Sequence, residues 1–328
     1  MRILLSSVGR RGYLVKFFKE SLGSNGEIWG GDNSQYAPAF AYCDKAVLLP
    51  KVTQADYADE LLSFCKANNI EMVVPLIDPE LEVLAAKREQ FYDAGVMVVI
   101  SPLDSVEIAF DKYLTYKFGR DNDIAVPETA MTVVAALELI DSHKLKWPVV
   151  VKPRKGSASA NISFCHTPNQ LENAFANCPG PMIQECLEGA EYGYDLFSDR
   201  QYRPINVYCK RKLLMRAGET DKAVSVNDKQ IIDFGIKIAT KLKIFGPVDV
   251  DVFMTQDGPK LLEINPRFGG GYPCSHLAGA DYPAKLIEIG SGKQLKPDFY
   301  TCPAGVYMFK QDEIISPAQE TLDTYEKI

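Results

Sequence analysis

The sequence predicts an α/β domain at the amino terminus followed by an α+β region, and three observations support this fold class. The chain has 328 residues, of which 46% are hydrophobic and 24% charged, so it is long enough for two or three domains with proper cores. Its first hundred residues alternate short apolar segments with amphipathic ones, which is the pattern of strands and helices around a parallel sheet. Near residue 250, two alternating segments flank a turn, which predicts an antiparallel hairpin.

The first βαβ unit has the outline of a mononucleotide-binding fold. It comprises a strand over residues 2–8, a turn over residues 9–12, a helix over residues 13–22 and a strand over residues 27–31 that ends at Asp32. The glycine fingerprint is incomplete, because Arg10 and Arg11 stand where a pyrophosphate-binding loop needs small residues. Two interpretations remain open: the arginines hold a carboxylate or phosphate of a substrate, or they are simply solvated.

The alternation continues with a helix over residues 56–68, a strand over 72–75, a helix over 81–94 and a strand over 96–100. Ligands of open α/β sheets bind beyond the carboxyl ends of the strands. Five residues in such positions are our candidates for substrate binding: Gly9, Arg10, Arg11, Asp78 and Glu80. For Asp78 we favour a structural role as the N-cap of the following helix, with Pro79 at the first helical position.

The middle of the chain predicts a phosphate-binding segment. A helix over residues 105–121 contains Asp111 and Lys112, and a helix near residues 133–142 precedes an apolar strand over 149–153 that carries Lys152 at its end. The next loop, residues 154–161, consists mainly of small residues whose backbone N–H groups are free to face an anion. A lysine at the mouth of such a loop suits a triphosphate.

Further elements follow as far as the carboxyl terminus. We expect helices over residues 169–177, 230–242 and 281–290, sheet over 182–187 and 203–214, and a polar loop over 216–222. The tail is expected to add a strand near residues 306–309 and then to end loosely.

The hairpin formed by residues 248–254 and 260–265 carries the strongest chemical signal. Asp249 and Asp251 lie on one strand and Glu263 and Asn265 on the other, and the period of two places each pair on one face. Mg²⁺ suits such oxygen ligands and leaves positions for phosphate oxygens. An odd-length loop over residues 255–259 would set Asp251 opposite Glu263, whereas a two-residue loop at residues 257–258 would separate the acids, so we predict the odd loop. Asp249 is expected at the rim of the cation site rather than as a direct ligand.

Composition excludes several other classes. The net charge of −7 argues against a nucleic-acid partner, because phosphate backbones need a basic surface. The sequence contains no uncharged run of membrane-spanning length and no signal-peptide pattern, so we expect a cytoplasmic protein without membrane contact. Its cysteines and histidines are dispersed without metal-ligand spacing, which predicts neither a zinc site nor a cysteine nucleophile.

These motifs occur in a recognisable order. The series consists of Asp111-Lys112, Val151-Lys152-Pro153 with the small-residue loop, Gln184-Glu185-Cys186-Leu187 with Gly189 and Glu191, Asp251, and Glu263-Ile264-Asn265-Pro266-Arg267. It resembles the ATP-grasp superfamily, and most of all the branch of the carbamoyl-phosphate synthase large subunit, over nearly the whole chain. The resemblance implies a Rossmann-like pre-ATP-grasp domain (residues 1–104), a two-subdomain ATP-grasp fold (residues 105–298, with a lid at about 123–187 and a metal-binding subdomain at about 188–298) and an extension (residues 299–328).

The resemblance also implies a role for each motif residue. The residues implied to hold ATP are Lys112 and Lys152 at the α- and β-phosphates, Gly156, Ser157 and Ser159 over the triphosphate, Glu185 and Leu187 at the adenine, and Glu191 at the ribose. The ligands implied for Mg²⁺, or Mn²⁺ in its place, are Asp251, Glu263 and Asn265. Arg267 and Arg216 are the implied catalytic residues and would face the γ-phosphate or an acyl phosphate.

The chemistry implied by the family is activation of a carboxylate as an acyl phosphate, followed by attack of an amine. The carbamoyl-phosphate synthase large subunit has two tandem sets of these motifs and this chain has one, so we favour a stand-alone carboxylate-amine ligase with small-molecule substrates, for which a homodimer is one open assembly. One alternative is a carbamoyl-phosphate synthase-type subunit that phosphorylates bicarbonate or carbamate and needs a partner subunit. Another is a nicotinamide-dependent oxidoreductase built on the amino-terminal fold.

Overall fold

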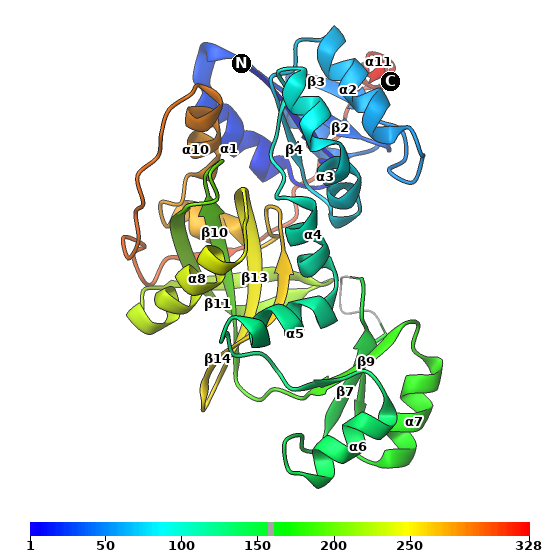
Figure 1. Cartoon of the computed structure of the whole chain (residues 1–328). Helices are drawn as coiled ribbons and strands as arrows, with labels where there is room; N and C mark the ends of the chain where they lie inside the picture. The colour runs from blue at the N-terminus through cyan, green and yellow to red at the C-terminus, as the bar shows by residue number, and fades with distance from the viewer. Residues whose placement is uncertain (157–160) are drawn as a thin grey trace.

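The structure is a computed structural model that describes residues 1–156 and 161–328. Figure 1 shows three parts: an amino-terminal α/β domain, a central sheet with its helices, and a small sheet-and-helix subdomain that projects away from both. In the described residues no helix is both long and apolar enough to cross a membrane.

The amino-terminal domain is built on a parallel sheet in the order β16-β3-β2-β1-β4-β5. Its strands are β1 (Arg2–Ser6), β2 (Glu27–Asp32), β3 (Lys45–Leu48), β4 (Met72–Pro75), β5 (Met97–Val98) and β16 (Glu326–Lys327), and its helices are α1 (Gly12–Leu22), α2 (Tyr57–Ala67) and α3 (Asp78–Asp93), with short 3-10 turns at Gly23–Asn25 and Pro38–Tyr42. Alternate residues of β1 enter separate cores, Ile3 and Leu5 on one face and Leu4 on the other. The apolar run of β1 is therefore buried on both faces, as in other parallel sheets.

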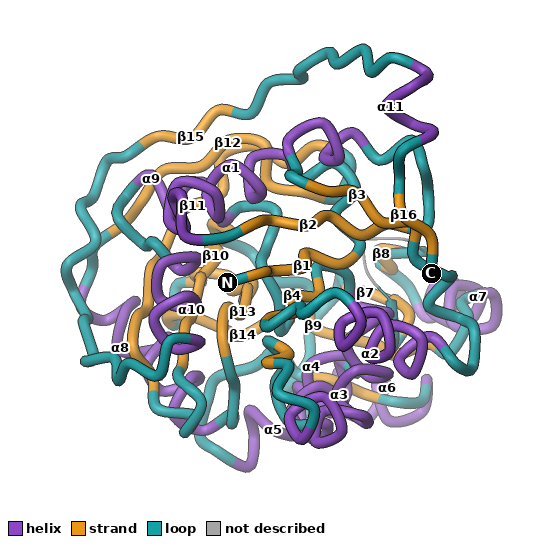
Figure 2. The backbone as a smooth tube through the Cα atoms, turned by 90° about the horizontal axis from the view of Figure 1, so that it is seen from above, coloured by secondary structure: helices purple, strands orange, loops and turns teal. Residues whose placement is uncertain are grey.

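The predicted βαβ alternation is confirmed, with two corrections. Strand β3 (Lys45–Leu48) was not predicted, because its four residues carry too short a pattern to stand out. The chain also does not end loosely. Figure 2 shows the tail running from β15 past α11 (Gln319–Asp323) to β16, where Glu326 pairs with Val47 of β3.

The central sheet is antiparallel, in the order β14-β13-β10-β11-β12-β15. Its strands are β10 (Ala190–Ser198), β11 (Pro204–Arg216), β12 (Glu219–Val226), β13 (Gly246–Thr255), β14 (Gly258–Asn265) and β15 (Tyr307–Phe309), and its helices are α4 (Leu103–Phe110), α5 (Lys112–Asp121), α8 (Lys229–Lys241), α9 (Tyr272–Leu277) and α10 (Tyr282–Gly290). Phe197, Phe268 and Tyr282 of this region share one core with Ile3 and Phe18 of the amino-terminal domain. The two parts therefore pack on each other through a continuous apolar layer.

The projecting subdomain, which we call the lid, has its own sheet and core. Its antiparallel sheet runs in the order β6-β9-β7-β8, with strands β6 (Thr129–Ala130), β7 (Val149–Pro153), β8 (Ser163–Cys165) and β9 (Pro181–Glu185) and helices α6 (Val133–Asp141) and α7 (Pro168–Asn177). Val149, Val151 and Ile183 pack with Ala136 and Leu171 of the helices. The strand and the two helices that we predicted here are confirmed.

The helix predicted over residues 105–121 is in fact two helices. Asp111 has an extended backbone and ends α4, and its carboxylate then accepts hydrogen bonds from the N–H groups of Tyr113 and Leu114 at 3.0 and 3.3 Å. An aspartate at an N-cap satisfies free donors of a first helical turn, so Asp111 starts a new helix instead of continuing the old one. The break places Lys112 at the first position of α5.

The polar loop predicted over residues 216–222 is also wrong, because most of it belongs to β12. Arg216 pairs with Glu219, which leaves only Ala217 and Gly218 in a tight turn with positive φ at both residues. The domain boundaries near residues 104 and 298 remain our proposal.

The acidic hairpin has the predicted pairing but reaches it by another route. Asp249 lies opposite Asn265 and Asp251 opposite Glu263, so all four side chains share one face, as predicted. The odd loop is wrong, since Thr255 pairs with Gly258 and only two residues form the turn. The register shifts between Asp251 and Val252, where Leu262 is the extra residue of a β-bulge. The one inserted residue turns the following side chains of the strand to the other face of the sheet, which is the effect that an odd-length loop would have.

Candidate active site

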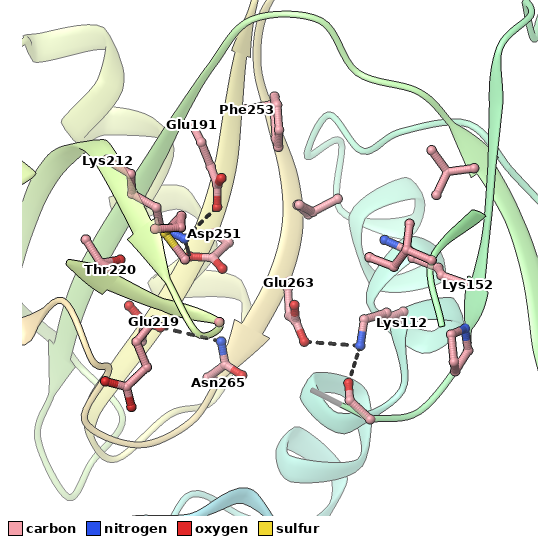
Figure 3. Close-up of a pocket in the computed structure, with 18 of the residues that line it drawn as sticks. Lys112, Lys152, Glu191, Lys212, Glu219, Thr220, Asp251, Phe253, Glu263 and Asn265 are labelled. Atoms are coloured by element: carbon pink, nitrogen blue, oxygen red, sulfur yellow. Dashed lines mark hydrogen bonds and ion pairs between the residues drawn. The ribbon is translucent and has the colours of Figure 1, made fainter. Parts of the chain in front are cut away.

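A cavity of about 770 Å³ lies between the lid and the face of the central sheet that carries the acidic hairpin. Lys152 of β7 lines it from the lid, Glu191, Asp251 and Glu263 line it from the central sheet, and Arg11 lines it from the amino-terminal domain. Figure 3 shows the hairpin acids facing the lid strand across this space. The motifs that the sequence singled out are thus brought to one site.

The acidic face of the hairpin is held in place by cations. The Nζ atom of Lys212 lies 2.6 Å from the Oδ1 atom of Asp251 and 2.6 Å from the Oε1 atom of Glu191. Burial raises the pKa of Asp251, and Lys212 opposes that shift. For Lys212 itself, burial favours the neutral form, but Asp251, Asp249 and Glu191 together raise its pKa. Lys212 therefore stays charged and stabilises the ionised form of the Asp251 carboxylate against the effect of burial.

Sequence reasoning missed Lys212, although a signal for it existed. Lys210 and Lys212 are two residues apart in a predicted strand, so they share a face. Lys210 is fully buried beneath the site, where its Nζ atom lies 2.5 Å from Asp195 and 3.8 Å from Asp249. Two buried lysines on one face of a strand need anions opposite them, and the hairpin supplies these.

Asp251, Glu263 and Asn265 are the right donor types for a hard cation, but they do not form a complete cage. Across the described residues, no cluster of three or more His, Cys, Asp or Glu side chains is able to hold a metal unaided. The amide of Asn265 donates a weak hydrogen bond of 3.5 Å to Asp249, so its carbonyl oxygen stays available. Such a set fits Mg²⁺, which often takes only one or two carboxylates and completes its shell with phosphate oxygens and water.

Two lysines face this set from the other side. Lys112 lies 3.1 Å from the Oε1 atom of Glu263 and donates a 2.6 Å hydrogen bond to the carbonyl of Gly156. Lys152 is 7% exposed and, within the described ranges, has no carboxylate within 4.0 Å. Burial lowers the pKa of Lys152 to about 8, a shift that Glu263 opposes and Lys112 reinforces. An unpaired buried ammonium on a cavity wall marks a place for an anionic ligand.

The lid side of the cavity is partly apolar. Val150 and Phe164 of the lid, Leu187 of the connecting segment and Phe253 of β13 line it. Glu185 also lines the cavity, but its carboxylate is paired with Lys260 at 2.7 and 2.8 Å and accepts a hydrogen bond from the N–H group of Glu128. Glu185 thus ties the lid to β14.

Three consecutive glycines allow the chain to pass close over the acidic face. A Cβ atom on Gly269 would lie 2.3 Å from the carboxylate carbon of Asp249, and one on Gly271 would lie 2.4 Å from Lys210. A Cβ atom on Gly270 would lie 3.0 Å from the carboxylate carbon of Glu219. The loop after Arg267 therefore has no room for side chains at these positions.

Arg267 lines the cavity and is fixed by Asp78. Its Nε and Nη2 atoms each lie 2.8 Å from an oxygen of the Asp78 carboxylate, a two-pronged pair that holds the guanidinium in one orientation. The favoured N-cap role of Asp78 is wrong, because Ile77 occupies the N-cap, no side chain caps the helix, and Asp78 is the first residue of α3. Asp78 therefore acts on the site through Arg267.

Several other predicted site residues lie outside the cavity. Arg10 pairs with Asp312 at 3.2 Å, and Arg216 pairs with Asp221 and Asp312 at 3.1 Å each with half of its side chain exposed. Glu80 is fully buried and accepts hydrogen bonds from Ser6 and Tyr57, and burial raises its pKa. Ser157 and Ser159 lie outside the described residues, whereas Gly156 lines the cavity.

The turn after β1 does not offer a nicotinamide site. Gly9 has a φ of 47° and donates its N–H to the Asp32 carboxylate at 2.9 Å, and Ser34 donates a second hydrogen bond to Asp32 at 3.0 Å. The acid that would bind a ribose in a dinucleotide fold is therefore already engaged. For this reason we do not carry the oxidoreductase alternative forward.

Two family models match successive parts of the chain. Residues 3–99 match the model of a PylC-like N-terminal domain, and residues 109–271 match the model of an ATP-grasp domain. These two matches meet near the start of α4.

Characterised proteins with related sequences include several ligases. A carbamoyl-phosphate synthase of Methanobrevibacter smithii is 24% identical over 242 residues, which is 69% of this chain and 65% of that protein. An L-arginine-specific L-amino acid ligase of Bacillus subtilis is 22% identical over 78% of this chain and 67% of its own length. A D-alanine–D-alanine ligase of Mycolicibacterium smegmatis is 27% identical over 60% of this chain and 61% of its own length. The chain thus spans about two thirds of these relatives.

Solved structures share the fold at low identity. The biotin carboxylase domain of Hydrogenobacter thermophilus 2-oxoglutarate carboxylase, solved with MgADP, ADP and bicarbonate, superposes with a TM-score of 0.74 over 93% of this chain and 73% of that one, at 14% identity. N5-carboxyaminoimidazole ribonucleotide synthetase of Thermotoga maritima gives a TM-score of 0.65 over 90% and 77%, at 17% identity.

Proposed function

Because the chain belongs to the ATP-grasp superfamily and carries a PylC-like amino-terminal domain, we propose that it is an ATP- and Mg²⁺-dependent ligase that joins a small carboxylate to an amine. In the first step a carboxylate oxygen attacks the γ-phosphorus of ATP, the bond to the β,γ-bridging oxygen breaks, and ADP leaves with the electron pair. In the second step the amine nitrogen attacks the acyl carbon, the carbon–oxygen bond to phosphate breaks, and inorganic phosphate leaves. The ammonium loses two protons in all, one of which is carried by the phosphate at neutral pH.

One observation above all supports this proposal: two lysine side chains face a set of oxygen ligands across a single cavity. Lys152 has no anionic partner in the described structure, and Lys112 is shared between Glu263 and a backbone carbonyl. Phosphoryl transfer needs mainly positioning and charge neutralisation, and this arrangement provides cations on one wall and metal ligands on the other. We assign Lys112 and Lys152 to the phosphates of ATP.

The remaining nucleotide contacts follow from the lining of the cavity. We place the adenine between the apolar side chains of the lid and Phe253, with the backbone near Glu185 and Leu187 at its edge. Glu191 would meet the ribose hydroxyls, which requires its carboxylate to share or release Lys212. Gly156 would lie over the triphosphate.

The metal would be held by Asp251, Glu263 and Asn265, whose oxygens suit Mg²⁺ and also Mn²⁺. When bound, such an ion neutralises phosphate charge and polarises the phosphoryl group. Arg267, oriented by Asp78, would face the γ-phosphate or the acyl phosphate. We leave Arg216 out of the catalytic set, because its side chain is exposed and paired with Asp221 and Asp312.

A carbamoyl-phosphate synthase-type subunit is the second candidate, because the first of the related proteins is a carbamoyl-phosphate synthase. The two candidates differ in what stimulates ATP cleavage. ADP formation that depends on bicarbonate and does not respond to any amine supports the synthase-type subunit. ADP formation that needs both a carboxylate and an amine supports the ligase.

The proposal is tested on the full chain with two variants. MgATP at a hundred times its dissociation constant should stabilise the wild type by about 2.7 kcal/mol. Glu263→Ala should abolish ADP formation, because it removes a metal ligand and the partner of Lys112. The control is Glu172→Ala, which removes an exposed carboxylate of α7 and should leave ADP formation unchanged. Absence of stabilisation by MgATP, or wild-type ADP formation by Glu263→Ala, would refute the proposal.

A further inference from the structure

Arg11 stands apart from the other residues of the cavity. Among the described residues that line the cavity, it alone comes from the first 104 residues of the chain. It is the last residue before α1 and reaches the cavity beside Arg267, Gly270 and Glu219. The shared apolar core of the two domains fixes this meeting point, since Phe18 of α1 packs edge-on against Phe268.

Arg11 also lacks an anionic partner. In the described part of the chain no carboxylate lies within 4.0 Å of its guanidinium, and its buried Nε atom has no hydrogen-bond partner. The neighbouring basic side chains are all paired: Arg10 with Asp312, Arg267 with Asp78 and Lys310 with Glu219. A buried guanidinium nitrogen without a partner is unfavourable until an acceptor occupies the space in front of it.

Glu219 supplies a negative charge close to Arg11 without touching it. Burial favours the neutral form of this carboxyl, but Lys310, Arg11 and Arg267 lower its pKa, so it is ionised at neutral pH. Its Oε2 atom accepts a hydrogen bond of 3.1 Å from the Nζ atom of Lys310. Tyr13 lies in the same group, where burial raises its pKa to about 12 and Arg11 and Arg267 oppose the rise, so its hydroxyl keeps its proton.

The cavity is therefore lined by a cation, Arg11, that lowers the pKa of an anion, Glu219, although the two side chains are more than 4.0 Å apart. A ligand with one negative and one positive group on neighbouring atoms satisfies both of them. A simple carboxylate or bicarbonate satisfies only Arg11, and a simple amine satisfies only Glu219. Carboxylate–guanidinium pairing also adds geometric selectivity, because the guanidinium presents parallel N–H groups.

We propose that Arg11 binds the carboxylate and Glu219 the ammonium of an amino acid, so that one substrate of this enzyme is an amino acid. The inference rests on the proposed ligase function and specifies its substrate class. The carboxylate on Arg11 is the group that is not activated, since activation takes place where Arg267 and the metal ligands meet the phosphates. Arg11 is then a specificity-determining residue and has no part in phosphoryl transfer.

Binding is measured directly, so that the second substrate does not need to be known. The full chain is first loaded with Mg²⁺ and a non-hydrolysable ATP analogue. Its melting temperature is then recorded with a panel of L- and D-amino acids, with the amide and the N-acetyl form of each, and with bicarbonate. We expect at least one amino acid to raise the melting temperature, and its amide and N-acetyl form to have no effect, because each lacks one of the two charges.

The variants separate Arg11 from its neighbour. Arg11→Ala should weaken binding of that amino acid roughly 10- to 100-fold, which is the range for loss of a charge-assisted hydrogen bond, and should leave the affinity for the ATP analogue within about twofold. Glu219→Gln should weaken binding of the amino acid as well. Arg10→Ala is the matched control, because this arginine lies outside the cavity, and it should bind the amino acid as the wild type does.

Three outcomes overturn the inference: Arg11→Ala binds the amino acid like the wild type, the amide binds as well as the parent amino acid, or bicarbonate alone shifts the melting temperature. Failure of the proposed function looks different, because the wild type would then show no stabilisation by Mg²⁺ and the ATP analogue. An amino acid that binds without the analogue would still support the role of Arg11.

Discussion

Replacement of Lys152 by methionine should make the ligand-free protein more stable while it abolishes nucleotide binding. Lys152 is 7% exposed, and burial lowers its pKa from 10.5 to about 8. At 1.36 kcal/mol for each pH unit, keeping this ammonium charged inside the fold costs about 3 kcal/mol. Methionine retains an unbranched apolar chain of similar length, so Lys152→Met removes the charge and preserves most of the packing. The free energy of unfolding at pH 7 should rise by about 1–3 kcal/mol.

The assay is urea unfolding of the full chain at pH 7, with and without MgATP. Lys155→Met is the control, because Lys155 lines the same cavity but is exposed and lies over the ring of Phe110. That variant should gain no stability without nucleotide. Lys152→Met should gain stability without nucleotide and gain nothing further from MgATP. If Lys152→Met is less stable than the wild type, or if MgATP still stabilises it fully, Lys152 is not an unpaired buried cation that binds the phosphates of ATP.

Three further predictions concern charge at the site. Below about pH 8 Lys152 is protonated in the folded protein, so affinity for MgATP should be level up to that pH and fall above it. The unfolded chain keeps this proton up to about pH 10.5 and so binds more protons between these values. The contribution of Lys152 to the free energy of unfolding should therefore rise as the pH increases from about 8 to about 10.5. The measurement is the difference in melting temperature between the wild type and Lys152→Met as a function of pH. Lys212→Met should destabilise the protein by about 3 kcal/mol, because it leaves Asp251 and Glu191 without their shared cation. Millimolar Mg²⁺ should restore part of that loss in urea unfolding, and a loss below about 1 kcal/mol would contradict the role of Lys212.

Side-chain periodicity and the alternation of strands and helices predicted much of the fold from the sequence. The period of two in a strand is set by backbone geometry, so the shared face of Asp249 and Asp251, and that of Glu263 and Asn265, followed from spacing alone. Spacing did not determine that the two pairs face each other, because that facing depends on the β-bulge at Leu262. The alternation of apolar strands and amphipathic helices likewise predicted the parallel sheet of the first domain. The order of motifs along the chain then gave the resemblance to the ATP-grasp superfamily, and the match of residues 109–271 to the model of an ATP-grasp domain agrees with it.

Spacing did not reveal which residues meet across the fold. Arg10 and Arg11 are adjacent in the sequence, yet one lies over Asp312 and the other lines the cavity. Glu80 and Asp78 flank one proline, yet one is buried under Tyr57 and the other holds Arg267. A difference of one or two residues at the end of a strand changes the direction of a side chain, and only the packed partners decide which direction is used.

The route to the hairpin register carries a general lesson. One extra residue in the loop and one extra residue in a β-bulge have the same effect: each shifts the pairing of the two strands by one residue and so changes which side chains share a face. Asp251 pairs with Lys212, Asp249 lies 3.8 Å from Lys210 and Glu263 pairs with Lys112. The extra residue at Leu262 brings these acids to one face of the hairpin. The requirement that these side chains share one face is therefore a stronger constraint on the hairpin than the length of its turn.

The same reasoning explains why the two ends of the cavity have different support. The end with Arg11 and Arg267 rests on the apolar core shared by the amino-terminal domain and the central sheet. The end with Lys152 and Phe164 rests on the separate core of the lid, which is tied to the rest by polar pairs such as Asp111 with Arg154 at 2.6 Å and Glu185 with Lys260 at 2.7 Å. Polar pairs at a partly exposed junction contribute less than a packed core. The groups that we propose to select the substrate are thus held more firmly than the groups that we propose to enclose the nucleotide. This difference suits the proposed ligase, whose lid would admit ATP and release ADP.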